Sequence, residues 1–350
     1  MPALKALWLP LATQEGLQRS SHALSVSAGK AFVFGGELKP RTPVDAAVTE
    51  LDLRDESSRT LAAHATTEWP SGRVGATFVS AKGKVYLWGG RGGKDMGTFA
   101  GETGIWAFDP STASWAQHET NGEQPEPRSF HTMAACGDNL YLHAGCPASG
   151  RLAQLHSLDL TNWTWTRLPD APEPARGGTV LTALPACTAS TPLLARYGGF
   201  AGYEVGGLDI YDVEAQKWST IDEQVEGGGE GPGKRSVQSF VGTDGALEYK
   251  DKVVVALLSM GEREAAPKEL GHDGAGFFHS DAWALLATKD AAPTFSWLRL
   301  ESSARSKGQP EPRGWLASTL VAGSQVIIHG GLNAKNERLA DAWTLEALLE

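Results

Sequence analysis

Two arginines that follow short apolar runs are candidates for binding a small ligand, although a structural role also explains them. Arg91 directly follows Gly89 and Gly90, and Arg151 lies shortly after Gly145. An arginine side chain presents a planar fork of hydrogen-bond donors that suits a sulfate or a carboxylate. Neither arginine recurs in every repeat of the chain, whereas recurrent residues are usually structural. We therefore interpret both as candidates that hold the anionic group of a substrate.

Three further residues are candidates for substrate contacts. Trp315 follows Gly314 near the start of one of the internal repeats described below. At that position we expect its side chain to face the mouth of a central channel. Tyr203 and Glu204 lie in a glycine-flanked segment on the same predicted loop face, although a simple turn also explains them. Packing between strands is the structural alternative for the tryptophan.

Several other chemistries find no support in the sequence. Cys136, Cys146 and Cys187 have no metal-like spacing, and no nucleophile-elbow motif occurs. The glycine-rich stretch at residues 226–233 follows no strand in phosphate-binding spacing, so it does not predict a nucleotide site. An odd number of cysteines favours a reducing compartment.

The composition favours an all-β protein without a polyanionic partner. The 350 residues include 41 glycines, 19 prolines and 12 tryptophans, which indicates many turns and aromatic packing residues. Nucleic acids and anionic membranes are bound by positively charged protein surfaces. A net charge of -10 therefore argues against both partners. No signal-peptide core or membrane-spanning apolar stretch is visible. We therefore expect a cytoplasmic location.

An internal repeat organises the whole chain. Apolar runs end in a doublet of small residues, and successive doublets lie about 54 residues apart in the first four copies. The six copies are residues 31–36 (AFVFGG), 85–90 (VYLWGG), 140–145 (LYLHAG), 194–199 (LARYGG), 253–261 (VVVALLSMG) and 326–331 (VIIHGG).

A second marker keeps the same phase, because an arginine opens each of the six units. These arginines are Arg19, Arg73, Arg128, Arg176, Arg235 and Arg313. Their recurrence favours a structural role, in which each binds backbone carbonyl groups around the central channel. Two markers in one register make a chance repeat improbable.

The strands that follow each doublet complete a four-stranded unit. A third strand is predicted at residues such as 104–109 and 155–159, and a fourth is centred on a tryptophan such as Trp165 or Trp297. The sixth unit, residues 313–350, ends without its tryptophan strand. Residues 4–9 resemble the missing strand, so we predict that the N-terminus pairs with the last unit and closes the ring.

The doublet, the later aromatic residue and the tryptophan strand together resemble the kelch repeat, and the resemblance covers essentially the whole chain. It implies a six-bladed β-propeller with four-stranded antiparallel blades, formed by residues 1–350 as one domain. Kelch propellers serve both as protein-docking modules and as enzymes, so the fold alone does not determine the function.

Residues 261–283 resemble the fifth-blade loop of the nitrile-specifier and thiocyanate-forming proteins. That family acts with ferrous iron on glucosinolate aglycones. The resemblance implies that Glu264 and His272 bind iron, but the position expected to be aspartate is Lys268. An ammonium group there would repel a metal. Glu269 or Glu262 is the alternative source of the missing oxygen ligand. The same resemblance matches Arg91 and Arg151 to substrate-facing positions.

The sequence thus predicts a lyase-type enzyme or a binder of a small anionic organic substrate, with Fe(II) as its cofactor. Two alternatives stay open. The first is a non-catalytic module that docks a protein partner. The second is a metal-free enzyme of secondary metabolism in which Lys268 binds the substrate or acts as an amine, provided that burial lowers its pKa. A solvated polar loop is the structural alternative for Glu264, Glu269 and His272.

Overall fold

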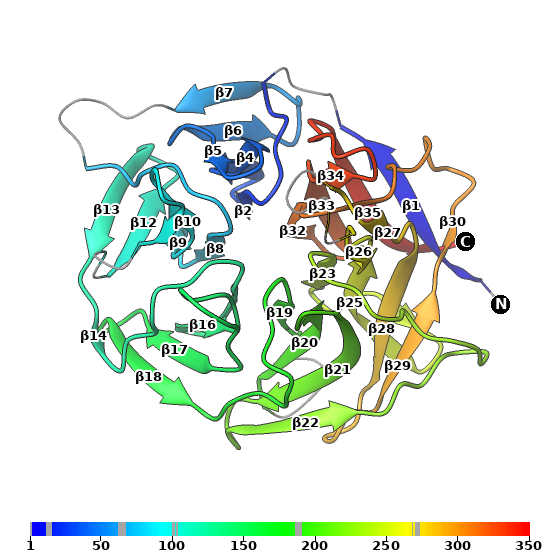
Figure 1. The fold of residues 1–350 in the computed structure, drawn as a ribbon. Coiled ribbons are helices and arrows are strands. Elements are labelled where there is room, and N and C mark those ends of the chain that lie inside the picture. The colour runs from blue at the N-terminus through cyan, green and yellow to red at the C-terminus, as the bar shows by residue number, and fades with distance from the viewer. Residues whose placement is uncertain are drawn as a thin grey trace.

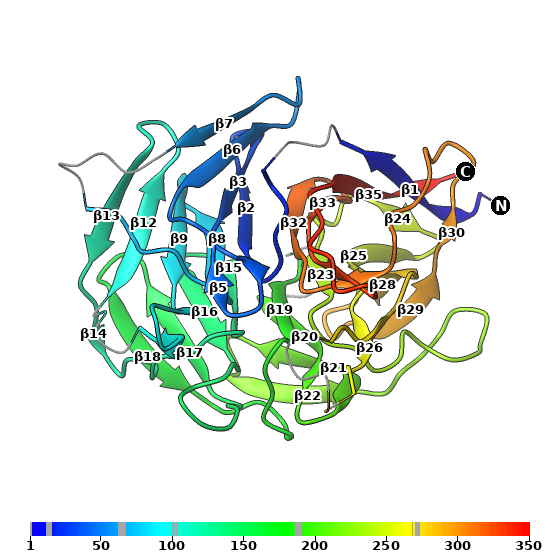
Figure 2. The same cartoon turned by 45° about the horizontal axis from the view of Figure 1, so that its top comes forward.

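The molecule is a ring of six small sheets around a common axis (Figures 1 and 2). The computed structural model describes residues 2–11, 16–61, 68–99, 102, 104–185, 191–267, 269 and 274–350. The four main strands of each sheet are antiparallel, and the innermost strands contact one another around the ring. This arrangement is the six-bladed β-propeller that the repeat predicted. No helix in the described ranges is long and apolar enough to cross a membrane.

The blades follow the order of the chain, and each begins with its innermost strand and ends with its outermost. Blade 1 contains β2 (Ala23–Ser27), β3 (Lys30–Phe34), β6 (Val48–Asp52) and β7 (Ser58–Leu61). Blade 2 contains β8 (Thr77–Ala81), β9 (Lys84–Trp88), β12 (Ile105–Asp109) and β13 (Ser114–His118). Blade 3 contains β15 (Thr132–Cys136), β16 (Asn139–His143), β17 (Leu155–Asp159) and β18 (Thr164–Leu168).

The second half of the ring repeats this order. Blade 4 contains β19 (Val180–Ala183), β20 (Leu193–Phe200), β21 (Glu204–Asp212) and β22 (Lys217–Ile221). Blade 5 contains β23 (Ser239–Gly242), β25 (Lys252–Ser259), β28 (Ala282–Thr288) and β29 (Phe295–Arg299). Blade 6 contains β32 (Ala317–Ala322), β33 (Gln325–His329), β35 (Ala342–Leu349) and β1 (Leu4–Pro10).

Short strands lie in the connections. Two of them extend an outer edge in parallel, namely β14 (Asn121–Gly122) on β18 and β30 (Glu301–Ser302) on β1. A third, β24 (Glu248–Tyr249), pairs with β25. The remaining pairs are β4 (Glu37–Lys39) with β5 (Thr42–Pro43), β10 (Arg91–Gly92) with β11 (Gly97–Thr98), β26 (Glu262–Glu264) with β27 (Phe277–Phe278), and β31 (Arg313–Gly314) with β34 (Leu332–Asn333).

The N-terminal strand closes the ring, as the sequence predicted. β1 pairs antiparallel with β35 from Leu4 opposite Leu349 to Pro10 opposite Trp343. In Figure 1 this blue strand lies beside the red C-terminal strand. Trp8 is fully buried in the cluster between blades 5 and 6, which is the place that the outer-strand tryptophans occupy elsewhere. Blade 6 therefore unites the two ends of the chain.

Backbone hydrogen bonds join each blade to the next at the doublets. The second residue of every doublet donates its N–H to the carbonyl oxygen of the next blade's repeat arginine, at 2.8–3.0 Å. Both doublet residues have positive φ, which favours glycine. A Cβ at Gly35 would lie 2.3 Å from the Arg73 oxygen, so the contact also requires the absence of a side chain. The doublets are thus joints between blades.

The repeat arginines are structural, as their recurrence indicated. Each guanidinium donates through Nη1 to the carbonyl oxygen of the first doublet residue in its own blade, at 2.9–3.2 Å. All six side chains are buried. Arg73, Arg235 and Arg313 also form ion pairs with Glu102, Asp281 and Asp341. The guanidinium thus braces one blade, while the backbone carbonyl of the same residue joins it to its neighbour.

Aromatic and aliphatic side chains fill the spaces between blades. Between blades 4 and 5, the ring of Trp297 lies 5.2 Å from that of Tyr197 and 6.1 Å from that of Phe240. All three are buried. The hydrophobic core is therefore divided among the blade interfaces.

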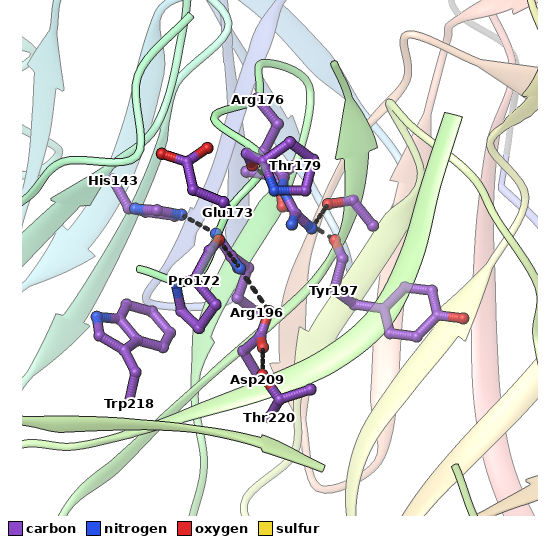
Figure 3. Close-up of polar contacts among 12 residues, drawn as sticks. His143, Pro172, Glu173, Arg176, Thr179, Arg196, Tyr197, Asp209, Trp218 and Thr220 are labelled. Carbon is purple, nitrogen blue, oxygen red and sulfur yellow. Dashed lines mark hydrogen bonds and ion pairs between the residues drawn. The ribbon is translucent and has the colours of Figure 1, made fainter. Parts of the chain in front are cut away.

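The interface between blades 3 and 4 contains a buried polar network beside its apolar contacts (Figure 3). Arg196 of β20 is fully buried and donates to Asp209 Oδ2 from Nε at 3.0 Å and from Nη2 at 2.5 Å. Its Nη1 lies 3.3 Å from Nε2 of His143 in blade 3, and its Nη2 donates to the Pro172 oxygen. At the equivalent position the other blades have Val33, Leu87, Leu142, Leu258 and Ile328. Arg196 is thus a polar lock between blades 3 and 4.

Candidate functional site

A closed ring of peptide groups, one from each blade, surrounds the axis of the propeller. Its members stand two positions after each repeat arginine, and each donates its N–H to the carbonyl oxygen of its counterpart in the preceding blade, at 2.8–3.0 Å. They are Ser21, Gly75, Phe130, Gly178, Val237 and Trp315. The Ser21 N–H donates to the Trp315 oxygen, so the circle is closed. We call these six residues the axial ring.

The axial ring holds three large side chains in an unfavourable backbone conformation. Phe130, Val237 and Trp315 have φ values of 51°, 49° and 55°. This left-handed conformation is a genuine outlier for bulky and β-branched residues, and it costs about 1–3 kcal/mol at each position. Such strain persists only where the surrounding structure overdetermines it. Closure of the ring by all six blades supplies that constraint.

A cavity of about 390 Å³ lies against the axial ring. Phe130, Val237 and Trp315 contribute to its lining, and the ring of Phe130 meets that of Trp315 edge-on at 5.4 Å. The walls come from the segments that join the second and third strands of the blades, and all six blades contribute. A cavity at such a mouth, with apolar walls and a few polar groups, is typical of small-molecule sites.

Arg91 and Arg151 both line this cavity, and each guanidinium lies over an aromatic ring. The Arg91 guanidinium carbon is 5.5 Å from the ring centre of Phe130, and its Nε donates to Ser129 Oγ at 2.7 Å. The Arg151 carbon is 4.8 Å from the ring centre of Phe200. Among the described residues, no carboxylate forms an ion pair with either arginine. Two half-buried positive charges thus face one space without a described counterion.

Cys146 lines the same cavity between the two arginines in sequence. Burial raises the pKa of its thiol, and the positive charges of Arg151 and Arg91 oppose that shift. Both guanidinium groups therefore lie near Cys146 in the cavity lining. Because burial is the larger cause, the structure does not favour a thiolate nucleophile. Cys136 is also a free thiol, and Cys187 lies outside the described residues.

Two buried glutamates lie together in blades 4 and 5, whereas the two arginines belong to blades 2 and 3. Glu262 lines the cavity, and both Glu262 and Glu204 have only 7% of their surface exposed. Burial, reinforced by the charge of Glu204, raises the pKa of Glu262 to about 8, against a hydrogen bond from the Gly276 backbone. Burial likewise raises the pKa of Glu204 to about 7, with a smaller opposite effect from the Ser236 hydroxyl. The cavity lining therefore includes one acid that can be protonated near neutral pH, Glu262, and Glu204 lies beside it.

The structure brings some of the predicted site residues together and separates others. Arg91, Arg151 and Trp315 line one cavity. Glu204 is buried beside Glu262 but is absent from the lining. Tyr203 is 60% exposed and also lies outside the lining.

The predicted iron ligands do not converge in the described part of the molecule. Glu264 and Glu269 are exposed and do not line the cavity. The described residues contain no group of three His, Cys, Asp or Glu side chains able to hold a metal. His272 and Lys268 lie outside the described residues. Of the acids considered as ligands, only Glu262 reaches the cavity, so the described residues do not fit an iron site.

Comparison with known proteins agrees with the repeat and the blade joints. The model of the KLHDC2/KLHL20/DRC7 kelch-repeats domain matches residues 21–248, which is more than half of the chain. This chain belongs to the kelch-repeat family. The match includes the doublets of the first four blades.

Individual kelch proteins resemble the chain to different extents. The N-(sulfonatooxy)prop-2-enimidothioate sulfolyase of Thlaspi arvense is 26% identical, and the match covers 96% of this chain and 95% of that protein. The bovine (Bos taurus) Rab9 effector protein with kelch motifs is 32% identical over only 39% of this chain and 36% of its own length. The solved structure of YjhT matches 97% of this chain and 99% of its own, with a TM-score of 0.66 and 14% identity, and shows a shared fold.

Sequence reasoning missed several kelch-loop residues that line the cavity. Phe130 and Val237 occupy the register of Trp315, two positions after a repeat arginine, so the repeat phase itself could have identified them. Glu262 was considered only as a metal ligand. Its pairing with Glu204 had no local signal, because the two residues belong to different blades. The repeat phase thus predicts the cavity residues that belong to the axial ring. The contact between Glu204 and Glu262 is seen only in the structure of the loops.

Proposed function

We propose that this kelch propeller binds a small organic anion in the cavity against the axial ring and acts on it as a lyase-type enzyme. One observation carries the proposal: Arg91 and Arg151 face the same cavity, and no described carboxylate neutralises them. The sulfolyase relative, which aligns with nearly the whole chain, is named for a substrate that carries a sulfonatooxy group. An anionic substrate suits both observations.

Each lining group has a distinct role in this proposal. The two guanidinium groups bind the sulfate or carboxylate of the substrate and hold it in one orientation. Phe130 and Trp315 pack against its apolar part. Glu262 lines the cavity, and its raised pKa makes it the candidate for exchanging a proton with the bound molecule.

Anion binding is tested by thermal unfolding with matched probes. Benzoate and benzenesulfonate should raise the melting temperature in a concentration-dependent way, whereas neutral benzamide should not, because only the anions bind both arginines. Arg91→Met and Arg151→Met should each reduce the shift. Arg299→Met, at an exposed position on outer strand β29, is the matched control. Equal shifts in all four proteins would show that the anions bind elsewhere.

The lyase part of the proposal requires a separate assay. An N-sulfonatooxy imidothioate is incubated with the wild-type protein and with Arg151→Met, and released sulfate is measured by ion chromatography. Faster release by the wild-type protein supports the enzyme. Anion binding without any acceleration would leave a binding protein and contradict the lyase.

Iron dependence is a proposal that rests on the resemblance to specifier proteins. The described candidates Glu264 and Glu269 do not support it, and His272 with Lys268 lies beyond the described residues. Anaerobically prepared protein is loaded with Fe(II), and its metal content and affinity are compared with those of His272→Ala. Stoichiometric iron that is lost in the variant supports the metal enzyme. No iron in either protein favours the metal-free alternative.

Protein docking is a second candidate, favoured by exposed apolar side chains around the mouth. Leu38, Tyr203 and Phe277 are each at least 50% exposed, and all three lie in segments between the second and third strands of their blades. The Rab9 effector relative is named for a protein partner. A Tyr203→Ser variant should lose a protein partner but keep benzoate binding, which separates the two candidates. We also propose a cytoplasmic location, consistent with the free thiols of Cys136 and Cys146.

A further inference from the structure

Two arginines and two buried acids lie on different sides of the cavity. Arg91 and Arg151 come from blades 2 and 3, and Glu262 comes from blade 5. Neither arginine forms an ion pair with Glu262, and no described cation forms one with Glu262 or Glu204. The two arginines and the two acids therefore do not pair with each other, so each side is open to a group of a bound ligand.

The acid side is unusual because the two carboxyl groups are buried together without a cation. Each glutamate is 7% exposed, and their charges act on each other. The Ser236 hydroxyl lowers the pKa of Glu204, but neither oxygen of Glu204 has a partner of normal hydrogen-bond geometry among the described residues. Buried acids are normally paired with a cation or with hydrogen-bond donors. Glu204 lies beside Glu262 but outside the cavity lining, and a cation bound at Glu262 would stabilise the charged form of both acids.

The backbone next to Glu262 makes room for its carboxyl group. A Cβ built at Gly276 would lie 2.2 Å from Glu262 Oε1, a distance that real atoms do not adopt. Glu262 is also tied at its backbone, because it exchanges both hydrogen bonds with Ser236, at 2.8 and 2.9 Å. Ser236 itself lines the cavity. The carboxyl is thus positioned by two segments of blade 5.

The two arginines likewise have hydrogen-bond donors without partners among the described residues. The Arg151 Nε is buried and has no hydrogen-bond partner among the described residues. Arg91 uses its Nε for Ser129, and no described group accepts from its two terminal nitrogens. A single ligand with an anionic end and a cationic end would complete both sides.

We propose that the ligand of this cavity is a small organic zwitterion, whose anionic group binds Arg91 and Arg151 and whose ammonium group binds Glu262, backed by Glu204. The aromatic rings of Phe130 and Trp315 also line the cavity and would contact the apolar part of the ligand. This inference rests on the proposed function and narrows its substrate from organic anions in general to amino-acid-like molecules.

Isothermal titration calorimetry with three probes of one shape tests the inference. Phenylalanine carries both charges, 3-phenylpropanoate carries only the carboxylate, and phenethylamine carries only the ammonium. We expect phenylalanine to bind at least about tenfold more tightly than either single-charge probe. Glu262→Gln should remove this advantage without weakening 3-phenylpropanoate. Arg151→Met should weaken both carboxylate probes.

The exposed neighbour Glu264 supplies the matched control, because Glu264→Gln changes the same charge two residues away. It should bind all three probes like the wild-type protein. If 3-phenylpropanoate binds as tightly as phenylalanine, the zwitterion is wrong but an organic anion still stands. If Glu262→Gln keeps the full preference for phenylalanine, the ammonium site is elsewhere and the inference is wrong. If no probe binds, both this inference and the proposed function are overturned.

Discussion

At the scale of single residues, the site depends on side chains that the propeller holds in costly states. Phe130, Val237 and Trp315 adopt left-handed backbone angles, and Glu204 and Glu262 are buried together. A chain optimised for stability alone would avoid both arrangements. Phe130, Val237, Trp315 and Glu262 all line one cavity, and such local conflict is expected at a functional site.

The buried acids predict a pH dependence of stability. The pKa of Glu262 is raised to about 8 by burial and by Glu204, so the folded protein retains a proton that the unfolded chain has already lost at neutral pH. The free energy of unfolding should therefore fall as pH rises from about 5 to 8, with a slope of at most about 1.4 kcal/mol per pH unit for this group. Glu262→Gln should fall less steeply and should be more stable than the wild-type protein at pH 8.

This prediction is measured by urea unfolding at a series of pH values. Glu264→Gln, an exposed change of the same type, should follow the wild-type curve. The prediction is contradicted if the stability of the wild-type protein rises between pH 5 and 8, or if the Glu262→Gln curve runs parallel to it. Either result would mean that folding does not raise the pKa of Glu262.

Sequence reasoning identified part of the cavity lining at this scale. Arg91 and Arg151 were candidates because they match substrate-facing positions of the specifier proteins, and Trp315 because it stands two positions after a repeat arginine; all three line the cavity. The acid pair could not be predicted in this way. Glu204 and Glu262 follow different doublets at different distances, so their contact depends on how two irregular loops fold.

At the scale of elements, the recurring apolar runs and the doublets that end them made the blades predictable. The outer tryptophan strands and the closure by residues 4–9 followed from the repeat register and are confirmed. The short paired strands inside the loops, such as β26 with β27, carry no comparable pattern and were not predicted.

The polar lock of Arg196 gives a prediction at this scale. Arg196→Leu should lower the free energy of unfolding by about 3–5 kcal/mol, because it leaves Asp209 buried without its cation. The double variant Arg196→Leu with Asp209→Leu should recover most of that loss, since the other blades have apolar residues at the Arg196 position. Denaturant unfolding of the two variants measures the difference.

An exposed ion pair is the control for this cycle. Lys289→Ala, which breaks the contact with Glu248 at the surface, should change stability by less than about 1 kcal/mol. If the double variant is no more stable than Arg196→Leu, then the network contributes through contacts other than the charge pair, such as the bond to Pro172.

At the scale of the whole molecule, ring closure underlies the cavity. The axial ring needs all six blades, and blade 6 needs the N-terminal strand β1. Trp8→Ala should therefore destabilise the protein by about 3–5 kcal/mol, because it empties a fully buried site between blades 5 and 6. Thermal and denaturant unfolding measure this loss.

Two milder changes on the same strand sharpen the test. Lys5→Ala removes only a partly exposed contact with Glu301 and should cost less than about 1 kcal/mol. Trp8→Phe should cost much less than Trp8→Ala, because the Trp8 Nε1 has no hydrogen-bond partner among the described residues. Equal stability of Trp8→Ala and the wild-type protein would mean that β1 does not hold the ring closed.

The central claim is that the cavity against the axial ring binds an organic anion through Arg91 and Arg151, and anomalous diffraction tests it most directly. Crystals of the wild-type protein and of the Arg91→Met, Arg151→Met double variant are soaked in 4-bromobenzoate, whose bromine marks its position. We predict a bromine peak inside the cavity, with the carboxylate toward the two guanidinium groups, and no such peak in the double variant. A peak only on the outer surface, or one that persists in the double variant, would contradict the account.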